Sequence, residues 1–210
     1  MDRILVYPGS IPLDTDLLNT NRNSMLALGY LAQAVLGTNT VVDVLACSPT
    51  TPGSLTVTIG PGSITQLSVM DTLTYGSLPS NMTDPLVKMG INLAATPFTL
   101  AVPTTSGQSV NYLIQSTLQE SDTDAVVLPY YNSANPAQPY SGPTNSGVAQ
   151  NTHRIQRVQI QLKAGAPANS GAQATPPIDN GWVGLYVITV SYGQTVIGVG
   201  NIAHMDKDAL

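Results

Sequence analysis

Apolar residues recur at helical spacing in only one part of the chain, residues 17–36. This run contains neither proline nor a cluster of β-branched residues. Asp14 or Asp16 can accept hydrogen bonds as an N-cap, and Gly37 supplies a C-terminal stop. The pattern therefore predicts a helix from about residue 15 to residue 36.

Two apolar rows follow this helix at alternating spacings of three and four residues. They are Leu17, Asn21, Ser24, Leu28, Leu31, Val35 and, beside it, Leu18, Met25, Gly29, Ala32, Leu36. Two interpretations stay open: an ordinary amphipathic helix on a sheet, and a helix that packs against copies of itself. In the second, we expect Leu28, Leu31 and Val35 to lie in the oligomer interface.

From residue 41 onward the pattern changes to short β-prone runs separated by Gly, Pro, Asn and Ser. In the clearest run, Val158, Ile160 and Leu162 alternate with polar residues, which is typical of an antiparallel strand with one wet face. We expect a mainly β fold: an antiparallel β-sandwich or barrel-like domain with long loops, preceded by one N-terminal α-helix. The expected division is an anchoring segment at 1–40 and a β-rich domain at 41–210.

Some segments do not fit a regular strand. Residues 83–93 permit either a short helix or a turn that leads into a strand. Residues 132–151 and 164–181 are too rich in Pro, Gly, Ser and Asn for regular structure, and loops of this length are usually functional. We expect these two loops to be arms that lie on neighbouring subunits, in preference to disordered segments.

The composition is poor in charge. Only 9% of the 210 residues are Asp, Glu, Lys or Arg, against about 25% in an ordinary domain, while the hydrophobic content of 42% is enough for a core. Such a surface indicates burial against neighbours or adaptation to stable extracellular exposure. Seven scattered Lys and Arg in a chain of net charge -5 make nucleic acid an unexpected partner.

No segment approaches the roughly 18 consecutive apolar residues that span a bilayer, and the first ten residues lack the apolar stretch of a secretory signal. We therefore expect no membrane insertion and synthesis in the cytoplasm.

Residues for catalysis or metal binding are scarce. The two histidines, His153 and His204, lack metal-ligand spacing, and Cys47 is the only cysteine, expected as a buried thiol on a strand. The only carboxylates that could pair for glycosidic cleavage are grouped in one run, for which a solvated turn is the favoured interpretation: Glu120, Asp122, Asp124. We predict no catalytic residue, no cofactor and no metal site.

One loop combines aromatic and amide side chains. Tyr130, Tyr131 and Tyr140 lie with several Asn residues in YYNSANPAQPY, a mixture typical of a surface that contacts carbohydrate or protein. An ordinary packed interface explains the same composition.

Residues 7–66 carry a family resemblance. YPGSIPLDTDLLNTNRNSMLALGYLAQAVLG, followed by VVDVLACSPTTPGSLTVTIGPGSITQ, resembles the N-terminal region of tail-fibre and related tail proteins of phages infecting Bordetella, Burkholderia and similar proteobacteria. DPLVKMGINL, LPYYNSANPAQPYSGP and GWVGLYVITVSYGQT continue the likeness. The chain stops at Leu210, without the long distal region of many tail fibres, which favours an anchor or collar component over direct receptor binding.

The resemblance implies a non-enzymatic structural protein of the phage virion tail. Such a protein forms a homotrimer and anchors or connects other tail, neck or fibre proteins. The alternative is a receptor-binding module that recognises a glycan or protein on the bacterial surface, in which Tyr130, Tyr131 and Tyr140 form the contact.

Overall fold

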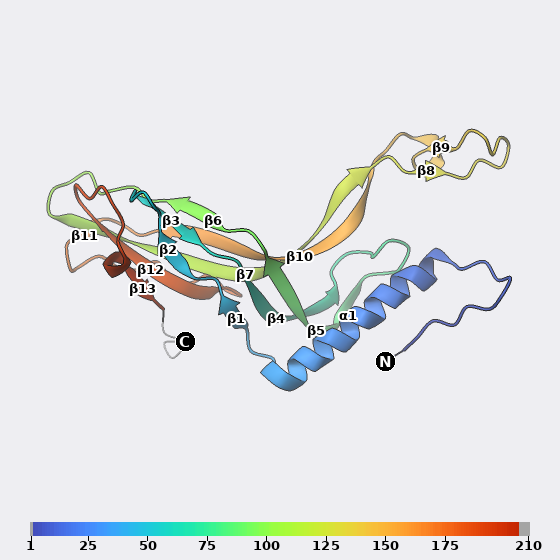
Figure 1. Cartoon of the computed structure of the whole chain (residues 1–210), viewed down its shortest axis with the longest axis horizontal. Coiled ribbons are helices and arrows are strands. Elements are labelled where there is room, and N and C mark those ends of the chain that lie inside the picture. Colours follow the sequence, from blue (N-terminus) through green and yellow to red (C-terminus); the bar gives the residue numbers. More distant parts are fainter. Residues whose placement is uncertain (1, 206–210) are drawn as a thin grey trace.

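The computed structural model describes residues 2–205. It confirms a mainly β, antiparallel fold with one N-terminal helix (Figure 1). Residue 1 of the expected anchoring segment and residues 206–210 of the expected β-rich domain lie outside the described part of the chain. The elements are α1 Asp14–Leu36, β1 Val41–Val44, β2 Cys47–Pro49, β3 Thr56–Ile59, β4 Gly62–Asp71, β5 Asn81–Asn92, β6 Thr96–Thr99, β7 Gln108–Val126, β8 Pro129–Tyr130, β9 Tyr140–Ser141, β10 Gln150–Ala164, β11 Ala168–Asn169, β12 Val183–Ser191 and β13 Ile202–His204, with 3-10 turns η1 Pro143–Asn145 and η2 Val199–Asn201.

Helix α1 has the predicted length but a different N-terminal cap. Leu13 is the N-cap, and its backbone N–H donates to Asp16 Oδ2 at 2.9 Å. The prediction that Asp14 or Asp16 caps the helix was therefore wrong, because Asp16 lies inside the first turn and binds the backbone N–H of the N-cap residue. Gly37 ends the helix with φ of 78° and a hydrogen bond to the carbonyl of Gln33, as predicted.

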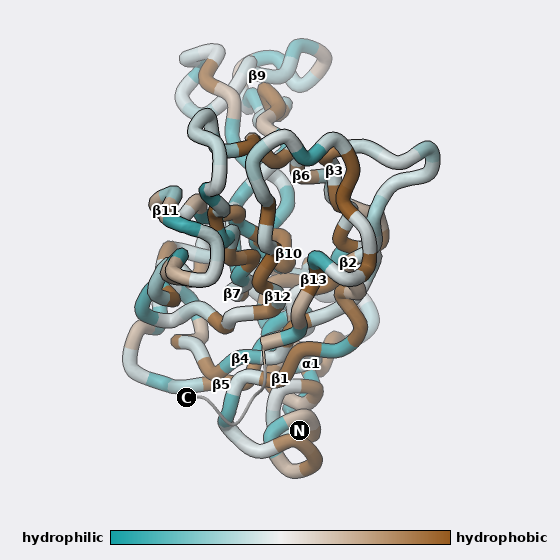
Figure 2. The backbone as a smooth tube through the Cα atoms, turned by 90° about the vertical axis from the view of Figure 1, so that its left-hand side faces the viewer, coloured by the Kyte–Doolittle hydropathy of each residue, from teal (hydrophilic) through white to brown (hydrophobic). Residues whose placement is uncertain are grey.

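The sandwich at one end of the molecule has two sheets. Sheet β2-β3-β6 packs on sheet β10-β7-β12-β13. Strand β11 pairs with the N-terminal end of β7. Alternate residues of β3, β7 and β12 fill the space between the sheets with buried side chains, among them Val57, Ile59, Tyr112, Ile114 and Ile188. Figure 2 shows hydrophobic stretches in α1, β1 and β3 among polar loops.

A third sheet, β1-β4-β5, joins the sandwich to the helix. Residues 83–93, which permitted two interpretations, belong largely to strand β5. Helix α1 lies on this strand at Gly29, where a Cβ atom would lie 2.7 Å from the carbonyl oxygen of Val87. Only glycine allows this close approach of helix and strand. The predicted strand around Cys47 is broken, because Val44 and Leu45 have positive φ and the chain changes sheet between β1 and β2.

Strands β7 and β10 form a ribbon that is longer than the sandwich. They pair from Tyr112↔Ala164 to Val126↔Gln150. The ribbon leaves the sandwich, passes the helix and ends in a projecting tip that contains β8 and β9 (Figure 1). The predicted alternation holds along β10: Val158 is buried, Ile160 and Leu162 pack against the core, and Arg157 is exposed.

Residues 164–181 cover the outer face of their own sheet. The backbone N–H of Asp179 donates to the buried Gln115, and Asn111 donates to Thr175 Oγ1 at 3.0 Å. The expectation of an arm on a neighbouring subunit was wrong for this loop. Asn111 and Gln115 are polar side chains on a face that needs cover, and the loop supplies their hydrogen-bond partners.

Candidate functional site

The two apolar rows of α1 face opposite environments. Gly29 is buried, and Leu18 and Met25 are half-buried on the sheet side. Leu28, Leu31 and Val35 are exposed to 68%, 61% and 72%. One row therefore packs on the sheet, as expected of an ordinary amphipathic helix. The other row, which was predicted to lie in an oligomer interface, is uncovered in the single chain. Its role in an interface stays a prediction.

Strand β5 extends this apolar surface into a groove. Val87, Met89 and Ile91 lie beside the second half of α1 and, with the helix, enclose a cavity of about 580 Å³. Met89 and Ile91 are exposed. We call this surface the α1/β5 groove; it runs along α1 from Met25 to Leu36, and its lining includes Leu28, Leu31, Val35, Val87, Lys88, Met89, Ile91. Monomeric proteins rarely leave a contiguous apolar surface of this kind in water.

From Leu17 onward, the exposed face of the helix carries no charge. Arg22 is the only charged residue between Leu17 and Leu36. Its side chain turns away from solvent, and Nη2 binds Asp71 Oδ2 at 2.8 Å. A helix that faces water normally carries charged residues on its outer side. The lack of charge here favours a helix that a second protein surface covers.

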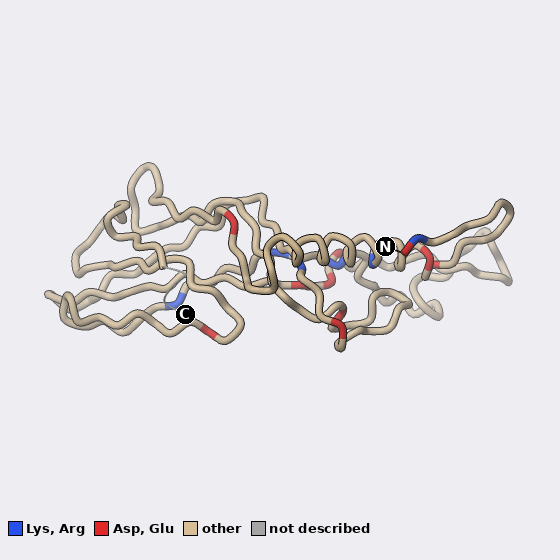
Figure 3. Tube along the Cα trace, turned by 90° about the horizontal axis from the view of Figure 1, so that it is seen from below, with Lys and Arg blue, Asp and Glu red and all other residues tan. Residues whose placement is uncertain are grey.

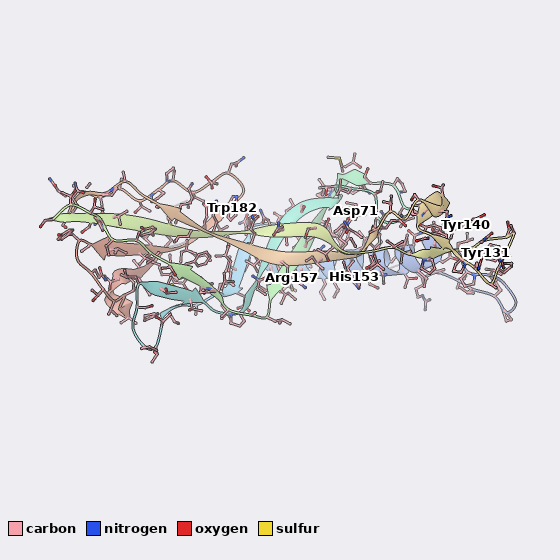
Figure 4. All side chains as sticks on the ribbon, turned by 90° about the horizontal axis from the view of Figure 1, so that it is seen from above. Asp71, Tyr131, Tyr140, His153, Arg157 and Trp182 are labelled. Atoms are coloured by element: carbon pink, nitrogen blue, oxygen red, sulfur yellow. The ribbon has the colours of Figure 1, made fainter. Side chains whose placement is uncertain are left out.

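Behind the helix, four charged residues from four elements form one network. Asp71 at the end of β4 binds Arg22 of α1 and, through Oδ1 at 2.9 Å, Arg154 of β10. Arg154 also binds Asp122 of β7 at 2.6 Å and lies over the ring of Tyr75. Asp71 is only 2% exposed. Figure 3 shows that charged residues gather along the middle of the molecule, and Figure 4 places Asp71 there.

A second buried pair lies next to this network. Lys88 of β5 is 2% exposed, and its Nζ binds Glu120 Oε2 of β7 at 2.8 Å. Gln156 of β10 donates to the same oxygen at 2.8 Å. The predicted solvated turn at Glu120, Asp122 and Asp124 was wrong, because these residues belong to strand β7, which pairs with β10 along this stretch.

The ion pairs also bear on the chemistry of these carboxylates. The hydrogen bond from Arg154 holds the pKa of Asp122 below its ordinary value. A general acid for glycosidic cleavage needs a raised pKa, so the environment of Asp122 opposes that role. Asp124 is exposed and lies 3.1 Å from His153.

The Asp122 pair predicts how stability depends on pH. Because the pKa of Asp122 is lower in the folded chain than its ordinary value of 3.8, the pair stabilises the fold above that value, and this contribution is lost as the pH falls through the folded pKa. We expect Asp122→Asn to flatten the fall in unfolding free energy as the pH is lowered below 3.8, measured by urea unfolding. Asp43→Asn, at an exposed site outside the network, is the matched control. Equal pH slopes for Asp122→Asn and the natural chain would contradict the prediction.

The network was not predicted from the sequence, although two signals point to it. Arg22 is the only charged residue between Leu17 and Leu36, in the apolar part of the helix, and Lys88 interrupts the apolar run LVKMGI. Long-range pairs such as Asp71 with Arg154 depend on the strand order, which local patterns do not contain.

A small cavity of about 250 Å³ opens beside the network, lined in part by Asn21, Met25 and Tyr75.

The remaining candidate residues are dispersed. His204 packs edge-on against Tyr186, with 5.1 Å between ring centroids, and lies far from His153 in the chain. Cys47 is half-buried, and burial raises the pKa of its thiol to about 11. Within residues 2–205, no three His, Cys, Asp or Glu side chains are grouped so that they could hold a metal ion.

The three tyrosines of the predicted contact loop meet at the tip of the ribbon. Tyr130 and Tyr140 are cross-strand partners in β8 and β9, and the hydroxyl of Tyr130 donates to Gln150. Tyr131 is strongly exposed, and Figure 4 shows it with Tyr140 at the end of the molecule away from Trp182. The structure brings these residues together, and their role as a receptor contact stays a prediction.

Comparison with known proteins assigns no family. No protein-family model, curated protein or solved structure matches this chain. Among the described residues, no helix combines the length and apolar character needed to cross a membrane. Function is therefore inferred from the sequence and the surface of the chain itself.

Proposed function

We propose that this chain is a non-enzymatic structural subunit that oligomerises through the apolar face of α1 and connects components of a phage virion tail. The observation that carries the proposal is the uncovered, uncharged row of Leu28, Leu31 and Val35 beside the exposed Met89 and Ile91. Burial of such a surface between copies removes apolar area from water, which is the main driving force of stable association.

The distribution of charge supports the same proposal. The network around Asp71 and the Lys88–Glu120 pair hold several of the few charged residues inside the chain. The Arg22–Asp71 pair fixes α1 against β4, and α1 packs closely on β5 at Gly29, so that its outer row is held on the outside of the chain. A preorganised surface loses less conformational entropy on association than a mobile one.

The resemblance of the sequence to phage tail proteins supplies the remaining part of the proposal. It supports a homotrimer, neighbours among tail, neck or fibre proteins, and a place in the virion. None of these follows from the apolar surface alone, which supports self-association in general.

Light scattering on the purified chain tests self-association. We expect a concentration-independent oligomer, with three times the chain mass if it is a trimer, and monomers for Leu28→Asp. An unpaired charge in an apolar interface costs several kcal/mol, so the association constant is expected to fall by roughly 100-fold or more.

The matched control is Val199→Asp. Val199 is 78% exposed and lies in η2, at the sandwich end of the molecule. This variant is expected to keep the mass of the natural oligomer. A monomeric natural chain at all concentrations would overturn the proposed function.

A further inference from the structure

The segment before α1 is an apolar arm with little cover. Leu5, Val6, Tyr7, Ile11 and Leu13 are all exposed, Ile11 to 89%. No charged residue occurs from position 4 to position 13. A short extended segment of this composition leaves most of its apolar surface in water, which is unfavourable unless another surface covers it.

We propose that this arm, residues 5–13, binds in the α1/β5 groove of a second copy of the chain. The inference rests on the proposed self-association and names the two surfaces that meet in it. The arm of one copy and the groove of the next are then both removed from water, and the same contact repeats from copy to copy as a heterologous interface.

The groove is long enough to hold either limb of the arm. The groove follows α1 from Met25 to Leu36, which is about 16 Å at a rise of 1.5 Å per residue. The turn at Pro8 and Gly9 divides the arm into two limbs, residues 5–7 and residues 10–13. As extended chain these limbs span about 10 Å and about 13 Å at roughly 3.3 Å per residue, so either limb fits within the length of the groove. The cavity of about 580 Å³ lies within the range of about 300–1,000 Å³ typical of pockets that enclose a bound group.

The chemistry of the two surfaces also agrees. Lys88 is the one charged residue that lines the groove, and its ammonium is held by Glu120 below the surface. Pro8 and Pro12 lack backbone N–H groups, so the arm is poorly suited to join a sheet edge as a full strand. Apolar side chains can bind in a groove without backbone hydrogen bonds from the arm, so the two prolines do not oppose this mode of binding.

The position of the arm in its own chain favours binding to another copy. Asp2 and Ile4 lie beside Thr20 and Asn23, on a different flank of α1 from the groove. The turn at Pro8 and Gly9, closed by hydrogen bonds between Tyr7 and Ser10, reverses the chain. The arm consequently projects beyond the start of α1 (Figure 1). The groove lies along the second half of the helix.

A second α1 helix would be a poorer occupant of the groove. Face-to-face helices would cover Leu28, Leu31 and Val35 but would leave Leu5, Tyr7 and Ile11 of the arm in water. The arm covers the helix row and removes its own apolar side chains from solvent in the same contact.

A disulfide between copies tests the proposal. Leu5→Cys and Leu31→Cys chains with different tags are co-expressed, so that mixed oligomers form, and then oxidised with diamide. The natural Cys47 is retained, because its pKa of about 11 leaves it mostly protonated at pH 8. We expect a dithiothreitol-sensitive heterodimer on a non-reducing gel.

The matched control pairs Ser106→Cys, in the exposed loop between β6 and β7, with Leu31→Cys. Groups held together in a complex reach effective concentrations in the millimolar range, so we expect at least about tenfold more product from Leu5→Cys than from this control. Light scattering on the same samples before oxidation reports whether oligomers are present.

The outcomes separate the two proposals. Two results would overturn the arm-in-groove contact and leave the proposed function standing. One is an intact oligomer that gives no disulfide between positions 5 and 31, and the other is an intact oligomer that gives mainly a disulfide between two Leu31→Cys chains. Monomers in the light-scattering measurement would overturn the proposed function itself. A heterodimer well above the control supports the contact.

Discussion

Replacing Asp71 with asparagine is expected to lower the free energy of unfolding by about 3–5 kcal/mol, the range found when one partner of a buried ion pair is removed. Asp71 is almost fully buried, and its two carboxylate oxygens bind Arg22 and Arg154. An amide cannot accept from both guanidinium groups, because one side of it carries hydrogens instead of a lone pair. Arg154 keeps Asp122, whereas Arg22 keeps only the carbonyl of Pro79.

Urea unfolding at pH 7 measures this effect, with Asp43→Asn as the control for the loss of one negative charge at an exposed site. Arg22 joins α1 to β4 through Asp71. We therefore also expect Asp71→Asn to raise the rate of amide hydrogen exchange, relative to the natural chain, more in α1 than in the sandwich strands. A loss below about 1 kcal/mol, the range of surface ion pairs, would show that water replaces the carboxylate at this site.

The helix illustrates what a local pattern can predict. Its bounds depended on the absence of proline and on the stop at Gly37, both of which are local features, and the structure agrees with them within one residue. The identity of the buried row was not predictable in the same way. Leu18, Met25 and Gly29 face inward because β5 approaches the helix closely at Gly29, and the position of β5 depends on its long-range pairing with β4.

The loops and charges show where local patterns fail. Residues 164–181 have a composition that predicted an arm on a neighbouring subunit, yet they fold back on their own sheet, where Asn111 and Gln115 of β7 need hydrogen-bond partners. The run of Glu120, Asp122 and Asp124 has the composition of a turn, yet it pairs with β10 because Arg154 and Gln156 lie opposite two of its acidic residues. In each case the deciding partner is distant in the sequence.

Glu120→Gln is expected to lower the free energy of unfolding by a similar amount, about 3–5 kcal/mol, because the buried ammonium of Lys88 loses its carboxylate. Lys88→Met should cost less, since Glu120 keeps its hydrogen bond from Gln156 and is partly exposed. The double variant Lys88→Met with Glu120→Gln should recover most of the stability that Glu120→Gln loses, because no unpaired charge is left in the site. The amide introduced at position 120 can pair with Gln156, so no unpaired amide is left either.

The cycle of these variants, measured by urea unfolding at pH 7, isolates the coupling between the two side chains. It also separates a structural Glu120 from a catalytic one. A structural carboxylate can be replaced together with Lys88 while stability and self-association are retained, whereas any glycosidic cleavage that depended on Glu120 would be lost in both the single and the double variant. Additive losses, with the double variant the least stable of the three, would contradict the buried pair. Recovery of stability with an unchanged oligomer would assign Glu120 to the support of α1 and β5, behind the surface through which we propose that the copies associate.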